Sequence, residues 1–154
     1  MAINPNTDFS SGAVLTAAQQ NRFPRGIVAF IESTSVDSYS TTETVKLTAT
    51  TFTAVANRYY RLTYYEPNTQ LPSGTSTFMT QRIRLTNAAG TLLAFGQGQS
   101  QSATQTTQTS FCQTVVTLSA GSTVIVGTMQ SSSGTPALFR SSRAFVLVED
   151  LGPS

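Results

Sequence analysis

The sequence predicts an all-β protein: a single antiparallel β-sandwich or jelly roll of about eight strands, preceded by an N-terminal arm that carries one short helix. Composition is the first reason. Of the 154 residues, 26 are Thr and 19 are Ser, whereas only 10% are charged, against about 25% in an average domain. Thr suits a pleated sheet, and Lys and Glu, which commonly cover helices, are scarce. The other two reasons are hydrophobic alternation with a period of two and turn residues at short intervals.

The first 26 residues differ from the rest of the chain and are expected to form an arm. Residues 1–12 are polar and loop-like, with turn residues around Pro5. A short helix is expected after Thr16, a suitable N-cap, and it should end before Pro24. Because so short a helix is marginal alone, it needs a partner to pack against. The chain therefore divides into an arm at 1–26 and a sandwich domain at 27–154.

The sandwich domain is expected to open with several strands. Residues 27–31 form a continuous apolar run, which is typical of a strand buried on both faces. Further along, Val45, Leu47 and Ala49 alternate with polar residues, as in a half-buried strand. Three further strands are expected at 51–55, 58–66 and 78–86.

The strand at 58–66 carries the main aromatic cluster. Tyr60 and Tyr64 share one face with Leu62, which fits the core. Tyr59 and Tyr65 point the other way, where either a neighbouring subunit or a ligand would cover them.

The second half of the domain continues as strands and turns. Residues 67–74 are expected to form a loop and 87–90 a hairpin turn, followed by a strand at 91–95. Residues 96–108 contain only Gln, Ser, Thr, Ala and Gly, and this low-complexity strip would suit an uncharged subunit contact. The remaining strands are expected at 110–118, 123–129 and 137–148.

The absence of histidine from the sequence removes the commonest general base and metal ligand. Cys112, the single cysteine, lies in a strand-like run and is expected to be a buried thiol. Glu149 and Asp150 are neighbours, so on a strand they point to opposite faces and are expected to be a charged strand end. We expect no enzyme activity, no catalytic residue, no cofactor and no metal, although a two-carboxylate glycosidase stays open on sequence alone.

Charge and hydropathy bear on the partners. The net charge is +2, and the nine cations do not cluster as duplex binding requires, so no nucleic-acid binding is expected. No run approaches a membrane helix and the start of the chain does not resemble a signal peptide, so we expect no membrane insertion and assembly in a host cytoplasm. Arg82 and Arg84 share a strand face, where they would either contact a subunit or phosphate or lie in solvent.

Residues 12–21, 23–29 and 144–153 resemble the openings and endings of small virion proteins from tailed bacteriophages, especially those of actinobacteria. Such proteins are usually minor tail or head-decoration proteins. The resemblance covers about a quarter of the chain and implies a structural component of the virion whose partners are other phage structural proteins.

The middle of the chain resembles the trimeric jelly rolls of tumour-necrosis-factor-like and complement-like heads. The similar segments are 52–54 followed by Tyr59 and Tyr60, and the turn at 118–121 before the Val-rich residues 124–126. The resemblance implies a homotrimer. The aromatic-glycine close of those families is missing here, so the trimeric symmetry rests on analogy.

Three functions are compatible with these observations. The first is a tail-associated minor tail or fibre-tip protein that docks through its arm, the second is a capsid decoration protein on the outer shell, and the third is a host receptor- or carbohydrate-binding module that contacts a cell-surface glycan. The residues expected to dock on the virion are Ile3, Phe9, Val14, Leu15 and Phe23. The residues expected to line an oligomer interface are Tyr59, Tyr65, Gln97, Gln99 and Gln101.

Overall fold

Strands dominate the computed structural model, which describes residues 12, 14, 16–21, 23–74, 76–100, 106–140 and 142–154. A single helical turn, α1 (Ala17–Gln20), precedes them. The strands are β1 (Gly26–Ser33), β2 (Asp37–Ser38), β3 (Thr44–Thr48), β4 (Phe52–Ala54), β5 (Arg58–Gln70), β6 (Thr77–Leu85), β7 (Leu92–Ser100), β8 (Thr107–Thr117), β9 (Gly121–Thr123), β10 (Ile125–Ser131), β11 (Ala137–Leu138) and β12 (Ala144–Pro153).

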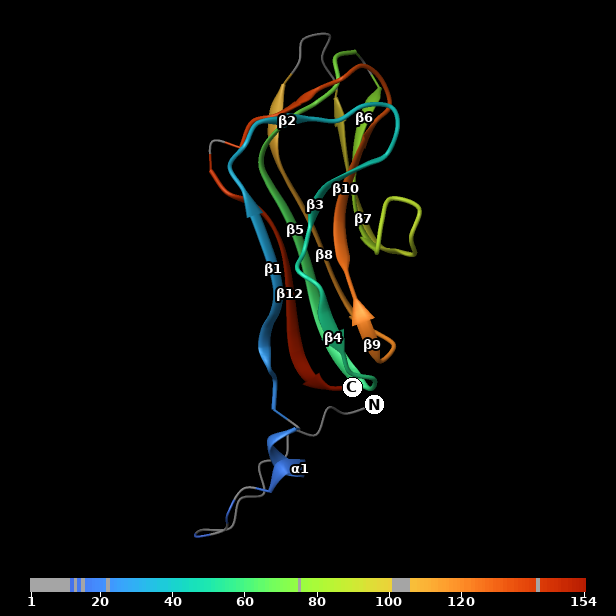
Figure 1. Ribbon diagram of the computed structural model, residues 1–154. Helices are drawn as coiled ribbons and strands as arrows, with labels where there is room; N and C mark the ends of the chain where they lie inside the picture. Colours follow the sequence, from blue (N-terminus) through green and yellow to red (C-terminus); the bar gives the residue numbers. More distant parts are fainter. Residues whose placement is uncertain are drawn as a thin grey trace.

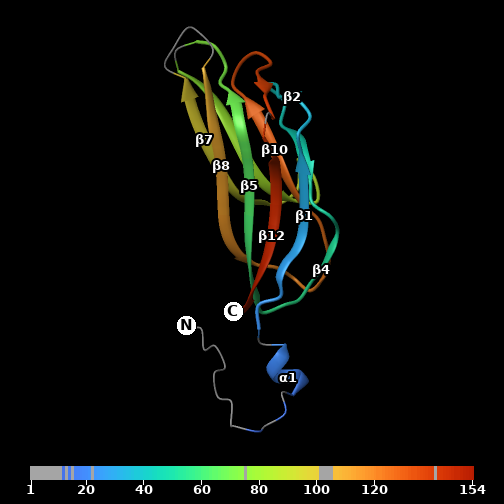
Figure 2. The same ribbon diagram turned by 90° about the vertical axis from the view of Figure 1, so that its left-hand side faces the viewer.

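Two antiparallel sheets face each other across the core (Figures 1 and 2). In the first sheet the long strands lie in the order β1, β12, β5 and β8, and β11 and β2 extend it beside the far end of β5. The second sheet has the order β3, β10, β6 and β7, and β4 pairs separately with β9. These eight main strands confirm the predicted antiparallel sandwich.

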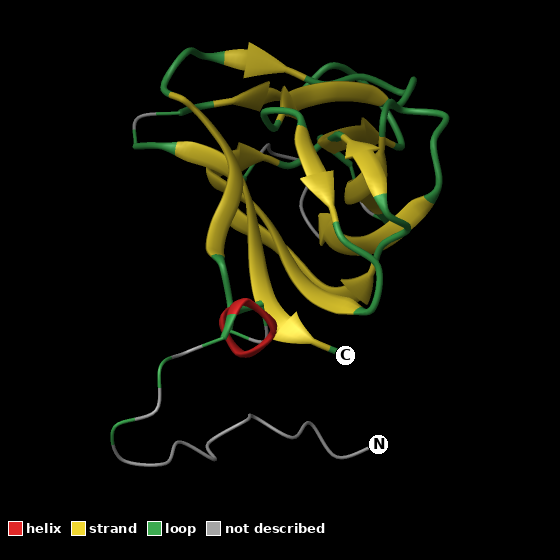
Figure 3. Cartoon of the chain, turned by 60° about the horizontal axis from the view of Figure 1, so that its bottom comes forward, coloured by secondary structure: helices red, strands yellow, loops and turns green. Residues whose placement is uncertain are grey.

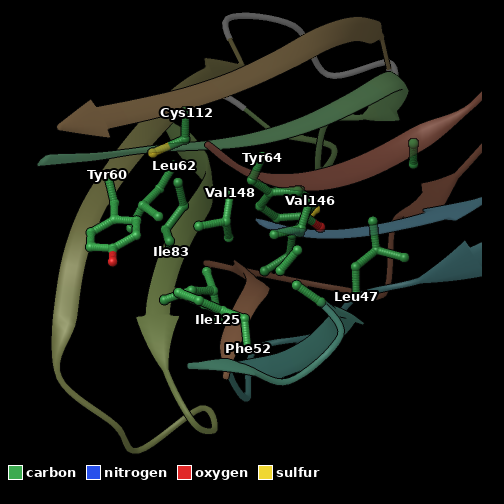
Figure 4. Packing of buried hydrophobic residues seen from close by; sticks show 14 of the residues in the cluster. Leu47, Phe52, Tyr60, Leu62, Tyr64, Ile83, Cys112, Ile125, Val146 and Val148 are labelled. Carbon is green, nitrogen blue, oxygen red and sulfur yellow. The ribbon is translucent and has the colours of Figure 1, made fainter. Parts of the chain in front are cut away.

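The core lies between the two sheets and draws on the residues that alternate along β5. Tyr60, Leu62 and Tyr64 are buried, as predicted, and they pack with side chains from both sheets (Figure 4). Gly127 on β10 permits this packing, because a Cβ atom there would lie 2.8 Å from the Tyr64 ring. The period-two pattern of β5 therefore fixes which side of the first sheet faces the core.

Three predicted strand boundaries are wrong. The expected loop at 67–74 begins as strand, because β5 continues to Gln70 through a register shift between Glu66 and Thr69 that absorbs Pro67. The expected low-complexity strip begins as strand too, since β7 runs on to Ser100. The single strand expected at 137–148 is two strands, β11 and β12.

Two burial predictions are also wrong. Ile27 and Phe30 on β1 are exposed, because none of the described elements covers the outer side of the first sheet. Val45 is exposed while Leu47 is buried. The pairing of β3 with β10 shifts register between Gly127 and Thr128, so a bulge interrupts the alternation on β3.

The segment before β1 and the C-terminus lie at the same end of the sandwich, which is the lower end in Figure 1, and α1 lies beyond this end (Figures 1 and 3). Thr16 caps α1, since its side chain accepts a hydrogen bond from the Gln19 amide and the Gln19 side chain accepts one from the Thr16 amide. The end of the sandwich at which the C-terminus lies is called the base of the sandwich below.

Candidate oligomer interface

The outer side of the first sheet carries large apolar side chains from all four of its long strands. Tyr65 on β5 lies opposite Phe145 on β12 and Phe111 on β8, and Phe30 on β1 lies opposite Leu147 on β12. We define the aromatic face by the side chains that this register gathers, which are Phe30, Tyr65, Phe111, Val115, Phe145 and Leu147.

Three rings of the aromatic face, those of Phe30, Phe145 and Tyr65, are in contact in series. Tyr65 and Phe145 stack with their centroids 5.2 Å apart, and the Phe30 ring lies 6.2 Å from the Phe145 ring. Phe111 is 55% exposed and Val115 is 52% exposed. Two polar side chains, Thr63 and Gln113, lie among these residues, and Gln113 donates a hydrogen bond to the Thr63 hydroxyl at 2.9 Å. Exposed apolar side chains gathered on one side of a sheet are typical of a protein–protein contact.

Two ion pairs lie among the apolar residues of this side of the sheet: Arg61 with Glu149, and Arg143 with Glu32, which lies opposite Phe145. Arg61 donates two hydrogen bonds to Glu149, from Nε at 2.7 Å and from Nη2 at 2.9 Å. These hydrogen bonds, more than the attraction between the two charges, hold the pKa of Glu149 below its usual value. Each pair is neutral as a unit, so a partner that covers the face would not have to bury an unpaired charge.

The structure places the predicted interface residues on two different sheets. Tyr65 belongs to the aromatic face, and Tyr59 lies on the same side of β5, opposite Thr117 of β8. Gln97 and Gln99 are exposed on β7 in the second sheet, where the Gln97 side chain donates to the Thr80 hydroxyl at 3.3 Å. The structure therefore does not bring these two glutamines to the tyrosines, and Gln101 lies outside the described residues.

Only two of the residues predicted to dock on the virion fall within the described part of the chain. Val14 and Phe23 are exposed ahead of β1. Ile3, Phe9 and Leu15 lie outside the described residues, so their role stays a prediction.

Sequence reasoning missed most of the aromatic face. Phe111, Gln113 and Val115 lie on the side of β8 opposite buried Cys112, and Phe145 and Leu147 alternate with buried Val146 and Val148 on β12. The alternation was visible in the sequence. The pairing of β5 with both strands, which brings the two sets together, was not.

The two arginines on β6 form an internal cluster with Glu43. Arg84 binds the Glu43 carboxylate through two hydrogen bonds, at 2.6 and 2.9 Å, and Arg82 Nη1 lies 3.2 Å from it. Burial alone would raise the pKa of Glu43, but hydrogen bonds from Arg84 and Thr128 and the charges of both arginines hold it below its usual value. The contacts with Glu43 account for both arginines on β6 without either a subunit contact or a solvated strand face, the two alternatives predicted from the sequence.

Asp150 corrects the prediction of a charged strand end. Its carboxylate is buried and accepts two hydrogen bonds from Arg58, both at 2.7 Å. Glu149 does point to the opposite face, as expected for neighbours on a strand. The two acids therefore pair with different arginines of β5: Asp150 with Arg58, and Glu149 with Arg61.

Cys112 is buried on β8, as predicted, and burial raises the pKa of its thiol to about 11. The thiolate, the nucleophilic form, is therefore a very small fraction at neutral pH. We expect the folded protein at pH 8 to react with a maleimide or a disulfide reagent at least about a hundredfold more slowly than the protein unfolded in guanidinium. Comparable rates in the two states would contradict this burial.

Two searches of the described residues bear on other kinds of site. Within these residues, no group of three or more His, Cys, Asp or Glu side chains is placed to hold a metal ion. No helix in the described part of the chain has the length and apolarity needed to cross a membrane.

Comparisons with known proteins show the fold. No family model matches the chain, and no curated protein matches it. Among solved structures it is similar to Eiger TNF from S. frugiperda, with 15% sequence identity and a TM-score of 0.50 over 84% of this chain and 96% of that one. A chain of infectious bursal disease virus, Gt strain, has 14% identity and a TM-score of 0.39 over 85% of this chain and 38% of its own. The first similarity establishes a jelly-roll fold like that of TNF.

Proposed function

We propose that this chain is a non-enzymatic structural protein of a bacteriophage particle that assembles as a homotrimer through its aromatic face. The observation that carries the proposal is that face: exposed and half-buried rings and aliphatic side chains on one side of one sheet, whose neighbouring charges, Arg61 with Glu149 and Arg143 with Glu32, are paired inside the chain. Burying such a surface stabilises association by about 25 cal/mol per Å² of apolar area. The bacteriophage assignment is supported by the resemblance of the chain ends to small virion proteins.

A second copy of the chain is the occupant that fits this face best. The face presents no net charge, since Arg61 pairs with Glu149 and Arg143 with Glu32, so it does not select a strongly acidic or basic partner. The chain as a whole has a net charge of only +2, which leaves little repulsion between copies. Closed cyclic symmetry is the usual outcome for identical chains, and the jelly-roll layout supports three copies by analogy.

Attachment to the particle is assigned to the segment before β1. Val14 and Phe23 are exposed there, and burying each of them on a partner would contribute about 1.5–3 kcal/mol. Three arms on one trimer would bind with avidity. We propose the tail as the site of attachment, and the outer capsid shell is the alternative position.

Two measurements test the proposal. Light scattering of the full-length protein at micromolar concentration is expected to give the mass of three 16.4 kDa chains. Immunogold labelling of particles of the phage that encodes the chain is expected to mark the tail. A monomer mass would overturn the homotrimer, label on the head would select the decoration role, and particles without the protein would overturn the structural role in the virion.

A further inference from the structure

Arg58 joins the segment before β1 to the base of the sandwich. Its guanidinium is buried and makes four hydrogen bonds. Two of them go to the Asp150 carboxylate on β12. The other two go to backbone carbonyl oxygens of the preceding segment, from Nη1 to Asn21 at 2.5 Å and from Nη2 to Phe23 at 2.6 Å. One side chain therefore holds three parts of the chain together.

The rest of this junction is built around the same carboxylate. Asp150 Oδ1 also accepts a hydrogen bond from the Gly152 amide at 2.8 Å, and Arg25 Nε lies 4.0 Å from Asp150 Oδ2. Gly26 follows with φ of +72°, a left-handed conformation that suits glycine and turns the chain into β1. Arg58 thus sits where the arm ends and the sandwich begins.

Hydrogen bonds to the backbone form part of the contact between the arm and the sandwich. Asn21, Pro24 and Arg25 are exposed, and Phe23 is 41% exposed. Charge-assisted hydrogen bonds to carbonyl oxygens are stronger than neutral ones, and a planar guanidinium can serve several acceptors at fixed angles. The two carbonyl contacts link the end of α1 to the body of the domain.

We propose that Arg58 is a positioning residue that latches the arm to the base of the sandwich, so that the docking segment leaves the body in one fixed direction. The inference rests on the proposed docking function, since it assigns a purpose to that direction. A segment held in place before docking loses less conformational freedom when it binds. The latch also orients all three arms of a trimer alike, which simultaneous attachment requires.

The test replaces Arg58 with lysine and measures the arm directly. Arg58→Lys keeps a positive charge beside Asp150, but a lysine ammonium cannot reach both carbonyls and both carboxylate oxygens. A nitroxide on Gln20→Cys reports arm motion, and buried Cys112 stays unlabelled. We expect the rotational correlation time of the label to fall at least threefold in Arg58→Lys, and incorporation into particles to fall at least tenfold, with the trimer retained.

The matched control is Arg140→Lys, the same change in another buried arginine–carboxylate pair, which bonds Glu66 and not the arm. It should leave both the label and incorporation as in the wild type. If Arg58→Lys does not fold, Arg58→Met combined with Asp150→Leu removes the latch without leaving a buried charge. A label equally mobile with and without Arg58, or full incorporation of a variant with a mobile arm, would overturn the latch. If the wild-type protein never joins particles, the docking function is wrong. The mobility of the nitroxide label would still test whether Arg58 holds the arm.

Discussion

Replacing Phe111 with glutamate is expected to dissociate the proposed homotrimer into folded monomers. The ring is 55% exposed on an isolated chain, so the substitution leaves the core intact. In an assembly built on the aromatic face, each new carboxylate would be buried without a partner, at a cost of several kcal/mol. A loss of about 4 kcal/mol per contact weakens association about a thousandfold. Sedimentation or light scattering across a concentration series measures the shift.

Phe95→Glu is the matched control for this prediction. Phe95 is even more exposed, at 66%, but it lies on β7 in the second sheet and is not part of the aromatic face. The control should stay trimeric with an unchanged melting temperature. Equal dissociation by both variants would mean that added charge alone disrupts the assembly, and an undisturbed trimer in Phe111→Glu would show that the aromatic face is not the interface.

The sandwich could be predicted because its evidence is local. Period-two alternation along 58–66 identified the buried side of β5, and it placed Tyr60, Leu62 and Tyr64 in the core. Tyr65 was correctly placed on the opposite side for the same reason. Such predictions require only the chain direction and the geometry of a strand.

The rest of the site depends on pairing between strands that lie far apart in the sequence. Tyr65 meets Phe145 because β5 pairs with β12, a register that no local pattern encodes. The burial of Asp150 follows from the same pairing, which brings it to Arg58. Register shifts displaced other predictions, as at Pro67 and at Val45, since one extra residue in a strand reverses the faces beyond it.

Arg140, Glu66 and Tyr64 form a second buried polar cluster, at the end of the sandwich away from the arm. Arg140 donates to both Glu66 oxygens, from Nε at 3.0 Å and from Nη2 at 2.7 Å, and the Tyr64 hydroxyl donates to Glu66 Oε1 at 2.8 Å. Burial first, and then the charge of Glu66, raise the pKa of Tyr64 well above its usual value. The tyrosine therefore stays a neutral donor, and Arg140 is the cation that balances the buried carboxylate.

Arg140→Met is accordingly expected to cost about 3–5 kcal/mol of unfolding free energy, because it leaves the Glu66 carboxylate buried without its cation. Adding Glu66→Gln removes that charge and keeps an acceptor for the Tyr64 hydroxyl, so the double variant should recover at least half of the loss. Urea unfolding at pH 7 measures both values. Removing the exposed pair with Arg143→Met should change stability by less than about 1 kcal/mol, since Arg143 and Glu32 are open to solvent. If Arg140→Met costs less than about 1 kcal/mol of unfolding free energy, or if the double variant recovers none of the loss, a group other than Arg140 compensates the Glu66 charge.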